Sequence, residues 1–176
     1  MKKQRFILKN HHKIQSDIQV EAQFEIEDKT LRLEFNIEGE IENYIFLKPS
    51  TQERANDLWK ATCFEFFFGY KGSKSYTEVN ISPSTKWNIY SFKGYRELLK
   101  EKNILTQPSI KVFQEKNRYS LLVTSNFNES FLNNGLVFNL AVILLDKNHI
   151  RHFYTLNRTP TTVDFHKKES WKVCIE

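Results

Sequence analysis

The sequence predicts an all-β protein, a two-sheet antiparallel β-sandwich with one or two short helices. About ten short segments alternate apolar and polar residues, and turn-forming residues separate these segments. Segments with helical periodicity are few, and this combination is typical of a sandwich. The 176 residues are enough for one domain with a substantial core. We expect a single domain over residues 17–176, preceded by a basic leader over residues 1–16 in which a first strand could form.

The leader carries the charge imbalance of the chain. Five basic residues precede the first acidic residue, Asp17, and they are Lys2, Lys3, Arg5, Lys9 and Lys13. The whole chain has 26 basic and 21 acidic residues, so it is neutral by count without these five. A nucleic-acid-binding protein carries its basic residues as a stripe on the folded surface. We therefore expect no nucleic-acid partner.

The sequence contains no apolar stretch of the ~20 residues that a membrane-spanning helix needs. The N-terminal segment also lacks the apolar centre of a signal peptide. These two observations predict a protein without a membrane partner and with a cytoplasmic location. They leave the oligomeric state open.

Residues 18–37 predict the first hairpin. Apolar residues occupy every second position on both sides of a turn at 27–30, and they are Val20, Ala22, Phe24, Ile26, Leu31, Leu33, Phe35 and Ile37. Polar residues fill the positions between them. The hairpin therefore has one apolar face and one solvated face, as antiparallel sheets commonly do.

Two segments depart from the strand pattern. Residues 48–59 predict a long loop with a helical turn over 52–58, and such loops often serve binding. Trp59 stands at the end of this loop, so we expect it at the lip of the surface that follows. Residues 94–103 predict a short helix, with Leu98 and Leu99 as its apolar face.

Residues 63–92 form the central block, which predicts three antiparallel strands joined by two turns. Pairing the first two strands about the turn at 70–75 places Phe66 beside Val79 in the core. The same register brings Glu65, Glu78 and Asn80 together on the opposite face. A tight turn at 82–85 would add Trp87 to that face.

A slip of one residue at this turn would replace Trp87 with Asn88 and Tyr90 on the polar face. Residues 109–113, 118–126, 136–145, 152–156 and 171–175 predict the remaining strands. The segment 136–145 is almost entirely apolar, so we expect it to be central and covered on both faces. A further helical turn is expected over 128–131.

The polar face predicts a binding site for a sugar or another small polar ligand. Sugars present apolar C–H faces and a belt of hydroxyl groups, so their sites combine aromatic rings with planar hydrogen-bonding groups. The candidate rings are Trp87, Tyr90 and Tyr95, the candidate acceptors are Glu65, Glu78 and Asn80, and Arg96 is the candidate donor. Asp164 and His166, two positions apart on an extended segment, would point to the same side. This pair could orient a ligand, hold a metal or bind buried backbone groups.

Other interpretations of the same residues remain open. Glu65 and Glu78 could act as the carboxyl pair of a glycoside hydrolase, although no motif fixes a water molecule between them. The aromatic rings could be ordinary core residues, and the chain could be a protein-interaction module. The histidines do not show the spacing of a metal centre. We favour a non-catalytic binding protein and predict no catalytic and no metal-binding residue.

Three parts of the sequence carry a resemblance to a known family. They are the motif TCFEFF at 62–67, the motif YTEVNISPS at 76–84, and Asp164 and His166 followed by Trp171. Together with Trp87, Tyr90 and Arg96, they resemble the bacterial DOMON-like domains, which are relatives of the family 9 carbohydrate-binding modules. The resemblance spans residues 18–176.

The resemblance implies a β-sandwich whose ligands are sugars or haem. Haem-binding relatives use Met and His as axial ligands, whereas the single Met of this sequence is Met1. This departure favours a sugar over haem. The calcium sites of the family 9 modules do not carry over residue by residue, so calcium is left open.

Overall fold

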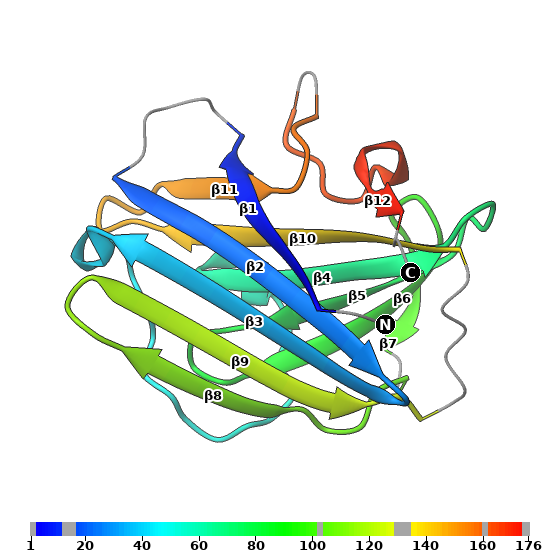
Figure 1. The fold of residues 1–176 in the computed structure, drawn as a ribbon, viewed down its shortest axis with the longest axis horizontal. Coiled ribbons are helices and arrows are strands. Elements are labelled where there is room, and N and C mark those ends of the chain that lie inside the picture. Colours follow the sequence, from blue (N-terminus) through cyan, green and yellow to red (C-terminus); the bar gives the residue numbers. More distant parts are fainter. Residues whose placement is uncertain (1–2, 12–16, 102–103, 129–134, 160–161, 174–176) are drawn as a thin grey trace.

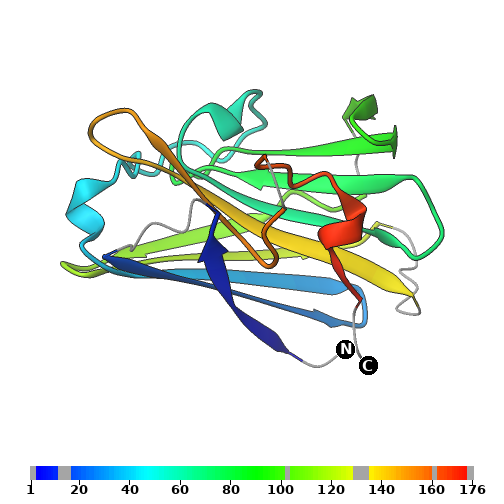
Figure 2. The same ribbon diagram turned by 90° about the horizontal axis from the view of Figure 1, so that it is seen from above.

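The computed structural model describes residues 3–11, 17–101, 104–128, 135–159 and 162–173, without the side chains of residues 99–101. Within these residues, twelve strands form two antiparallel sheets that pack face to face (Figures 1 and 2). The predicted two-sheet sandwich is confirmed.

The first sheet, sheet A, contains five strands in the order β1-β2-β3-β9-β8. Their bounds are β1 Gln4–Asn10, β2 Ile18–Glu27, β3 Thr30–Gly39, β9 Arg118–Asn126 and β8 Ser109–Gln114. The predicted hairpin is confirmed, because β2 and β3 pair along their whole length about the turn that joins Glu27 to Thr30.

The second sheet, sheet B, has the order β7-β6-β5-β4-β10-β11, and β12 pairs with one end of β10. The bounds are β4 Cys63–Tyr70, β5 Tyr76–Ile81, β6 Trp87–Gly94, β7 Glu97–Glu101, β10 Leu136–Leu145, β11 Arg151–Thr155 and β12 Lys172–Val173. Nine of the ten residues of β10 are buried, which confirms its central, doubly covered position.

Strand β1 connects the two sheets. Gln4 to Leu8 pair with β2 of sheet A, whereas Lys9 and Asn10 pair with β11 of sheet B. Figure 2 shows β1 running obliquely at the side where the two layers meet. The sandwich is therefore closed along this side by shared backbone hydrogen bonds.

The main core fills the space between the sheets and consists largely of aromatic and branched side chains. Phe24 of β2 contacts Phe66 of β4 and Phe138 of β10, with ring centroids 5.3 Å and 4.6 Å apart. Phe35 of β3 packs on Phe64 of β4, with centroids 5.2 Å apart. These rings join the layers through apolar burial and favourable ring geometry.

Short helical turns are present as predicted, but the turn expected over 52–58 is misplaced, because residues 52–57 form no helix and the turn in this region is Leu58–Lys60. The described residues contain three short 3-10 turns, Ile41–Asn43 (η1), Leu58–Lys60 (η2) and Lys168–Ser170 (η3), and no α-helix. The helix predicted over 94–103 is wrong, because this segment turns at Arg96, with φ 54°, and returns as strand β7. Backbone pairing along the edge of β6 outweighs the weak helical pattern of its leucines. Of the helical turn predicted over 128–131, only Asn128 lies within the described residues.

None of the helical turns in the described part of the chain is long and apolar enough to cross a membrane.

Candidate functional site

The candidate site lies on the outer face of sheet B, the face turned away from sheet A. The register predicted for the central block is confirmed: Phe66 pairs with Val79, Glu65 with Asn80, and Phe67 with Glu78. Because side chains alternate along a strand, the residues next to these core residues in sequence point outward. Glu65 of β4 and Glu78 of β5 therefore emerge on the same outer face.

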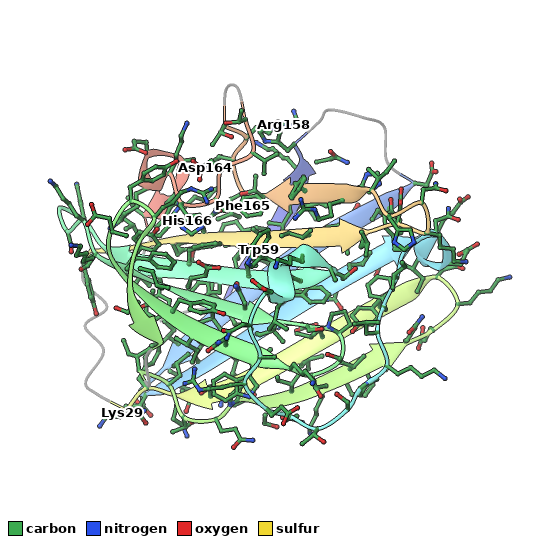
Figure 3. All side chains as sticks on the ribbon, turned by 180° about the vertical axis from the view of Figure 1, so that it is seen from behind. Lys29, Trp59, Arg158, Asp164, Phe165 and His166 are labelled. Atoms are coloured by element: carbon green, nitrogen blue, oxygen red, sulfur yellow. The ribbon has the colours of Figure 1, made fainter. Side chains whose placement is uncertain are left out.

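This face is hollowed into a cavity of about 830 Å³. Its floor crosses five strands of the sheet and is formed by Ile143, Glu65, Glu78, Tyr90, Phe92 and Leu98. One wall comes from the loop before β4 and consists of Asn56, Asp57 and Trp59. Val163, Phe165, His166 and Arg96 form a second wall, and Arg151 and Phe153 of β11 complete the rim. Figure 3 shows Trp59, Phe165 and His166 on this face of the sheet.

The C-terminal segment, residues 163–171, packs on the part of the outer face that lies beside the cavity. The ring of Phe67 lies 5.3 Å from that of His166 and 5.9 Å from that of Trp171, measured between centroids. The indole N–H of Trp171 donates to the backbone oxygen of Phe165 over 2.8 Å. Lys168 adds a hydrogen bond of 2.7 Å to the carbonyl oxygen of Ser73 in the turn between β4 and β5. These contacts bury the outer face of β4 and β5, and the main core buries their inner face.

Arg96 is held in place by Asp164. Its Nη2 donates to Oδ1 of Asp164 over 3.1 Å, and the hydroxyl of Tyr95 donates to Oδ2. Burial alone would raise the pKa of Asp164, but Tyr95, Arg96 and the backbone N–H of His166 together lower it. Asp164 is thus a charged anchor that joins the turn between β6 and β7 to the C-terminal segment.

His166 is tied to the same network through Tyr76. The backbone N–H of Arg96 donates to the Tyr76 hydroxyl oxygen, and that hydroxyl lies 2.7 Å from Nδ1 of His166. We assign the Tyr76 proton to this second contact, so that Nδ1 accepts and Nε2 carries the ring proton. Nε2 faces Oε2 of Glu78 at 3.8 Å.

The contact between His166 and Glu78 is not an ion pair at neutral pH. Burial lowers the pKa of His166 to about 4, and the nearby charge of Arg96 lowers it further. The charge of Asp164 acts in the opposite direction but is the smaller effect. The ring is therefore neutral at pH 7. Its role beside Glu78 is that of a neutral N–H group.

Glu65 and Glu78 are buried at the floor of the cavity, with exposed fractions of 3% and 6%. Burial raises the pKa of Glu65 well above its usual range, and the charge of Glu78 adds to this effect, while a hydrogen bond with the Cys63 thiol opposes it. Burial also raises the pKa of Glu78 to about 7, although Asn80 and Arg96 favour its charged form. Two carboxyl groups that share a low-dielectric floor hold their protons near neutral pH.

Asn80 lies beside Glu65 on the outer face of the sheet and contacts Glu78. Its Nδ2 donates to Oε1 of Glu78 over 2.7 Å. Its Oδ1 is buried and accepts no hydrogen bond from the described residues. The floor therefore offers more acceptors than donors.

The placement expected for Trp87 is wrong. The turn after β5 contains Thr85 in a left-handed conformation, with φ 68°, and the N–H of Ser82 donates to the oxygen of Lys86. This geometry pairs Ile81 with Trp87 and sends the indole into the core between the sheets. The alternative register is the observed one, because Asn88 and Tyr90 lie on the outer face.

Tyr90 and Asn88 are fixed by the loop wall. The Tyr90 hydroxyl donates to Oδ1 of Asn56 over 2.9 Å, and Nδ2 of Asn88 donates to the same oxygen over 3.0 Å. Arg54 donates to Oδ1 of Asn88 over 2.6 Å. Asn56 was not predicted as a site residue, because no local pattern in the loop indicates its contact with β6.

Trp59 lies at the lip of the cavity, as predicted, and it is 43% exposed. The guanidinium of Arg151 lies 5.8 Å from the centre of its indole ring and 5.7 Å from the ring centre of Phe153. Arg151 and Phe153 were not predicted as site residues. Arg151 and Phe153 are two positions apart on β11, so strand alternation could have indicated that they share one face.

The structure brings together most of the predicted site residues. Five of them line the cavity, namely Glu65, Glu78, Tyr90, Arg96 and His166. Asn80 contacts the cavity residue Glu78. Asp164 binds Arg96, and Tyr95 donates a hydrogen bond to Asp164. Trp87 is separated from the cavity by the sheet. Whether the lining residues bind a ligand stays a prediction.

The cavity residues do not fit haem. His166 is the histidine that lines the cavity, and its two ring nitrogens face Tyr76 and Glu78 rather than an axial position. Met1 lies outside the described residues. Within the described part of the chain, no group of three or more His, Cys, Asp or Glu residues is placed to hold a metal ion. We therefore derive no calcium site.

Comparison with known proteins shows a shared fold. No family model and no curated protein matches the sequence. A solved structure from Bacteroides uniformis, described as a candidate carbohydrate-binding protein, matches with a TM-score of 0.68 at 11% identity. The match covers 98% of this chain and 84% of that chain.

Two solved structures of a family 9 carbohydrate-binding module from Caldicellulosiruptor kristjanssonii are also similar. The complex with cellotriose matches with a TM-score of 0.53 at 10% identity, covering 90% of this chain and 74% of the module. The complex with glucose matches with a TM-score of 0.50 at 10% identity, covering 85% and 72%. The expected relation to these modules is confirmed in fold, whereas the relation to DOMON-like domains stays a prediction.

Proposed function

We propose that this chain is a non-catalytic binding protein for a carbohydrate, which occupies the cavity on the outer face of sheet B. The observation that carries the proposal is the composition of that cavity. An exposed indole at the lip and the ring of Tyr90 on the floor offer surfaces for the C–H faces of a sugar. Glu65, Glu78 and Arg96 offer planar acceptors and donors for its hydroxyl groups.

The size of the cavity and the likeness in fold support this function. A volume of about 830 Å³ lies within the range of small-molecule sites. The similar modules from Caldicellulosiruptor kristjanssonii were solved with glucose and cellotriose. A mono- to trisaccharide is therefore the first ligand class to test.

A thermal-shift screen with glucose, cellobiose, cellotriose and other small saccharides tests the proposal. A ligand that binds only the folded state stabilises it, by about 2.7 kcal/mol when its concentration is a hundred times Kd. For a chain of this size, each kcal/mol corresponds to a rise of about 2–4 °C in Tm. We expect at least one saccharide to raise Tm.

The Trp59→Ala variant should lose most of this shift, because it removes the exposed ring at the lip. The Phe113→Ala variant is the matched control, since Phe113 is 56% exposed on the distant strand β8. It should respond to the sugar as the unchanged protein does. Absence of a shift with every saccharide at millimolar concentration would contradict the proposal.

Glycoside hydrolysis is the second candidate function, because raised pKa values of Glu65 and Glu78 are typical of general acids. Aryl glycosides distinguish the two functions. A binding protein leaves them intact, whereas an enzyme would release the aryl group and lose that activity in Glu65→Gln and Glu78→Gln.

A further inference from the structure

The floor of the cavity is rich in hydrogen-bond acceptors. Glu65 lies opposite Asn80 on the neighbouring strand, and Glu78 stands two positions before Asn80 on that strand. Such diagonal neighbours on antiparallel strands lie about 7–8 Å apart, which leaves room for a small group between the two carboxyl groups. The unpaired Oδ1 of Asn80 lies on the same face of the sheet.

The charged and titratable groups around this floor do not neutralise it. Those that line the cavity are Asp57, Tyr90, Arg96, Arg151 and His166, while Cys63 lies beside Glu65 and Tyr76 contacts His166. The guanidinium of Arg96 is bound to Asp164, and that of Arg151 lies over the rings of Trp59 and Phe153. His166 is neutral at pH 7. The charge of Arg96 favours the ionised form of Glu78 from a distance, but no Lys or Arg among the described residues forms an ion pair with either carboxyl group.

A neutral sugar would leave this imbalance in place, because each hydroxyl group donates one hydrogen bond and brings no charge. An ammonium group donates three hydrogen bonds and carries the missing positive charge. Hydrogen bonds between charged partners are also about twice as strong as neutral ones.

We propose that the cavity selects a sugar that carries a primary amine, whose ammonium group lies between the carboxylates of Glu65 and Glu78. The inference rests on the proposed function and names its ligand class. The sugar ring would face Trp59 and Tyr90, and the amine would point to the floor. Binding of the ammonium group would release the proton that the carboxyl pair holds near neutral pH.

Isothermal titration calorimetry at pH 7.5 with glucosamine, glucose and N-acetylglucosamine tests this selection, because the three share one ring. We expect glucosamine to bind about tenfold more tightly than either neutral sugar, or better. Glu65→Gln and Glu78→Gln should each weaken glucosamine binding by about thirtyfold, since each removes one partner of a buried charge pair. Glucose binding should weaken much less than glucosamine binding in both variants, because the amide oxygen of glutamine still accepts a hydrogen bond from a hydroxyl group but carries no charge. Glu42→Gln, in the exposed turn η1, is the matched control and should bind all three sugars unchanged.

The pH dependence adds a readout that a purely structural role of the carboxyl groups would not give. Glucosamine affinity should fall as the pH is lowered from 7.5 to 5.5, because Glu78, with a pKa of about 7, takes up a proton. This fall should be absent for glucose.

Equal affinity for glucose and glucosamine would overturn the inference and leave the carbohydrate function intact. Tight binding of 2-aminoethanol without binding of any sugar would support the amine site and overturn the carbohydrate function. If neither sugars nor 2-aminoethanol bind, both proposals are wrong.

Discussion

Replacing both Glu65 and Glu78 with glutamine is expected to raise the free energy of unfolding at pH 8 by about 3 kcal/mol or more. The folded state raises the pKa of Glu78 from 4.5 to about 7, and each pKa unit corresponds to about 1.4 kcal/mol. Glu65 is shifted in the same direction. At pH 8, folding moves two carboxyl groups that are ionised in the unfolded state into a buried site that disfavours their charged form, and glutamine removes this cost.

The direction of the pH dependence follows from proton binding. Between pH 4.5 and 7, the folded state holds protons on these carboxyl groups that the unfolded state has released, so stability falls as the pH rises. His166 acts in the opposite direction. Its pKa is lowered from 6.5 to about 4, so its contribution to stability rises with pH between these values.

Urea unfolding from pH 4.5 to 8 measures these contributions. The unchanged protein should lose stability as the pH rises, because the loss from the two carboxyl groups exceeds the gain from His166. In the Glu65→Gln/Glu78→Gln double variant, the slope should reverse, since His166 remains. The Glu42→Gln control should reproduce the unchanged profile. A double variant with the same pH profile as the unchanged protein would show that the carboxyl groups are not buried as described.

The Phe24→Ala substitution is expected to lower the free energy of unfolding by about 3–5 kcal/mol, the usual cost of removing a buried phenyl ring. Phe24 is 1% exposed, and it contacts Phe66 and Phe138 across the space between the sheets. Loss of the ring would leave a cavity that two rigid sheets cannot close easily. Urea unfolding at pH 7 checks the value.

Phe113→Ala is the matched control, because it removes the same ring from an exposed position on edge strand β8. Its cost should remain below about 1 kcal/mol, the span of strand propensity. Equal losses in the two variants would contradict the assignment of Phe24 to the core between the sheets.

Much of the fold follows from strand periodicity. The alternation over 18–37 fixed which side chains of β2 and β3 face the core, and the pairing of Glu65 with Asn80 followed from the same rule. Trp87 was misplaced because the turn before β6 decides which of its side chains face the core. Thr85 takes a left-handed conformation in this turn, which composition does not predict. The error exchanged Trp87 for Asn88 and Tyr90.

The site was harder to predict than the strands, because its walls come from distant parts of the chain. Glu65 and Glu78 were expected on an open polar face, but Phe165, His166 and Trp171 cover part of that face. This cover buries the carboxyl groups and raises their pKa values. No local pattern connects residues 163–171 with β4, so the electrostatics of the site depend on tertiary packing.

Indole signals in a ¹⁵N–¹H NMR titration test the sugar site most directly, because each of the three Trp residues reports on a different place. Trp59 lies at the lip of the cavity, Trp87 is in the core between the sheets, and Trp171 is bound to Phe165. Single Trp→Phe variants assign the three signals. The Trp59 signal should shift when a binding saccharide is added, and the Trp87 signal should remain in place. A shift of Trp87 with an unchanged Trp59 would place the ligand elsewhere and contradict the proposed site.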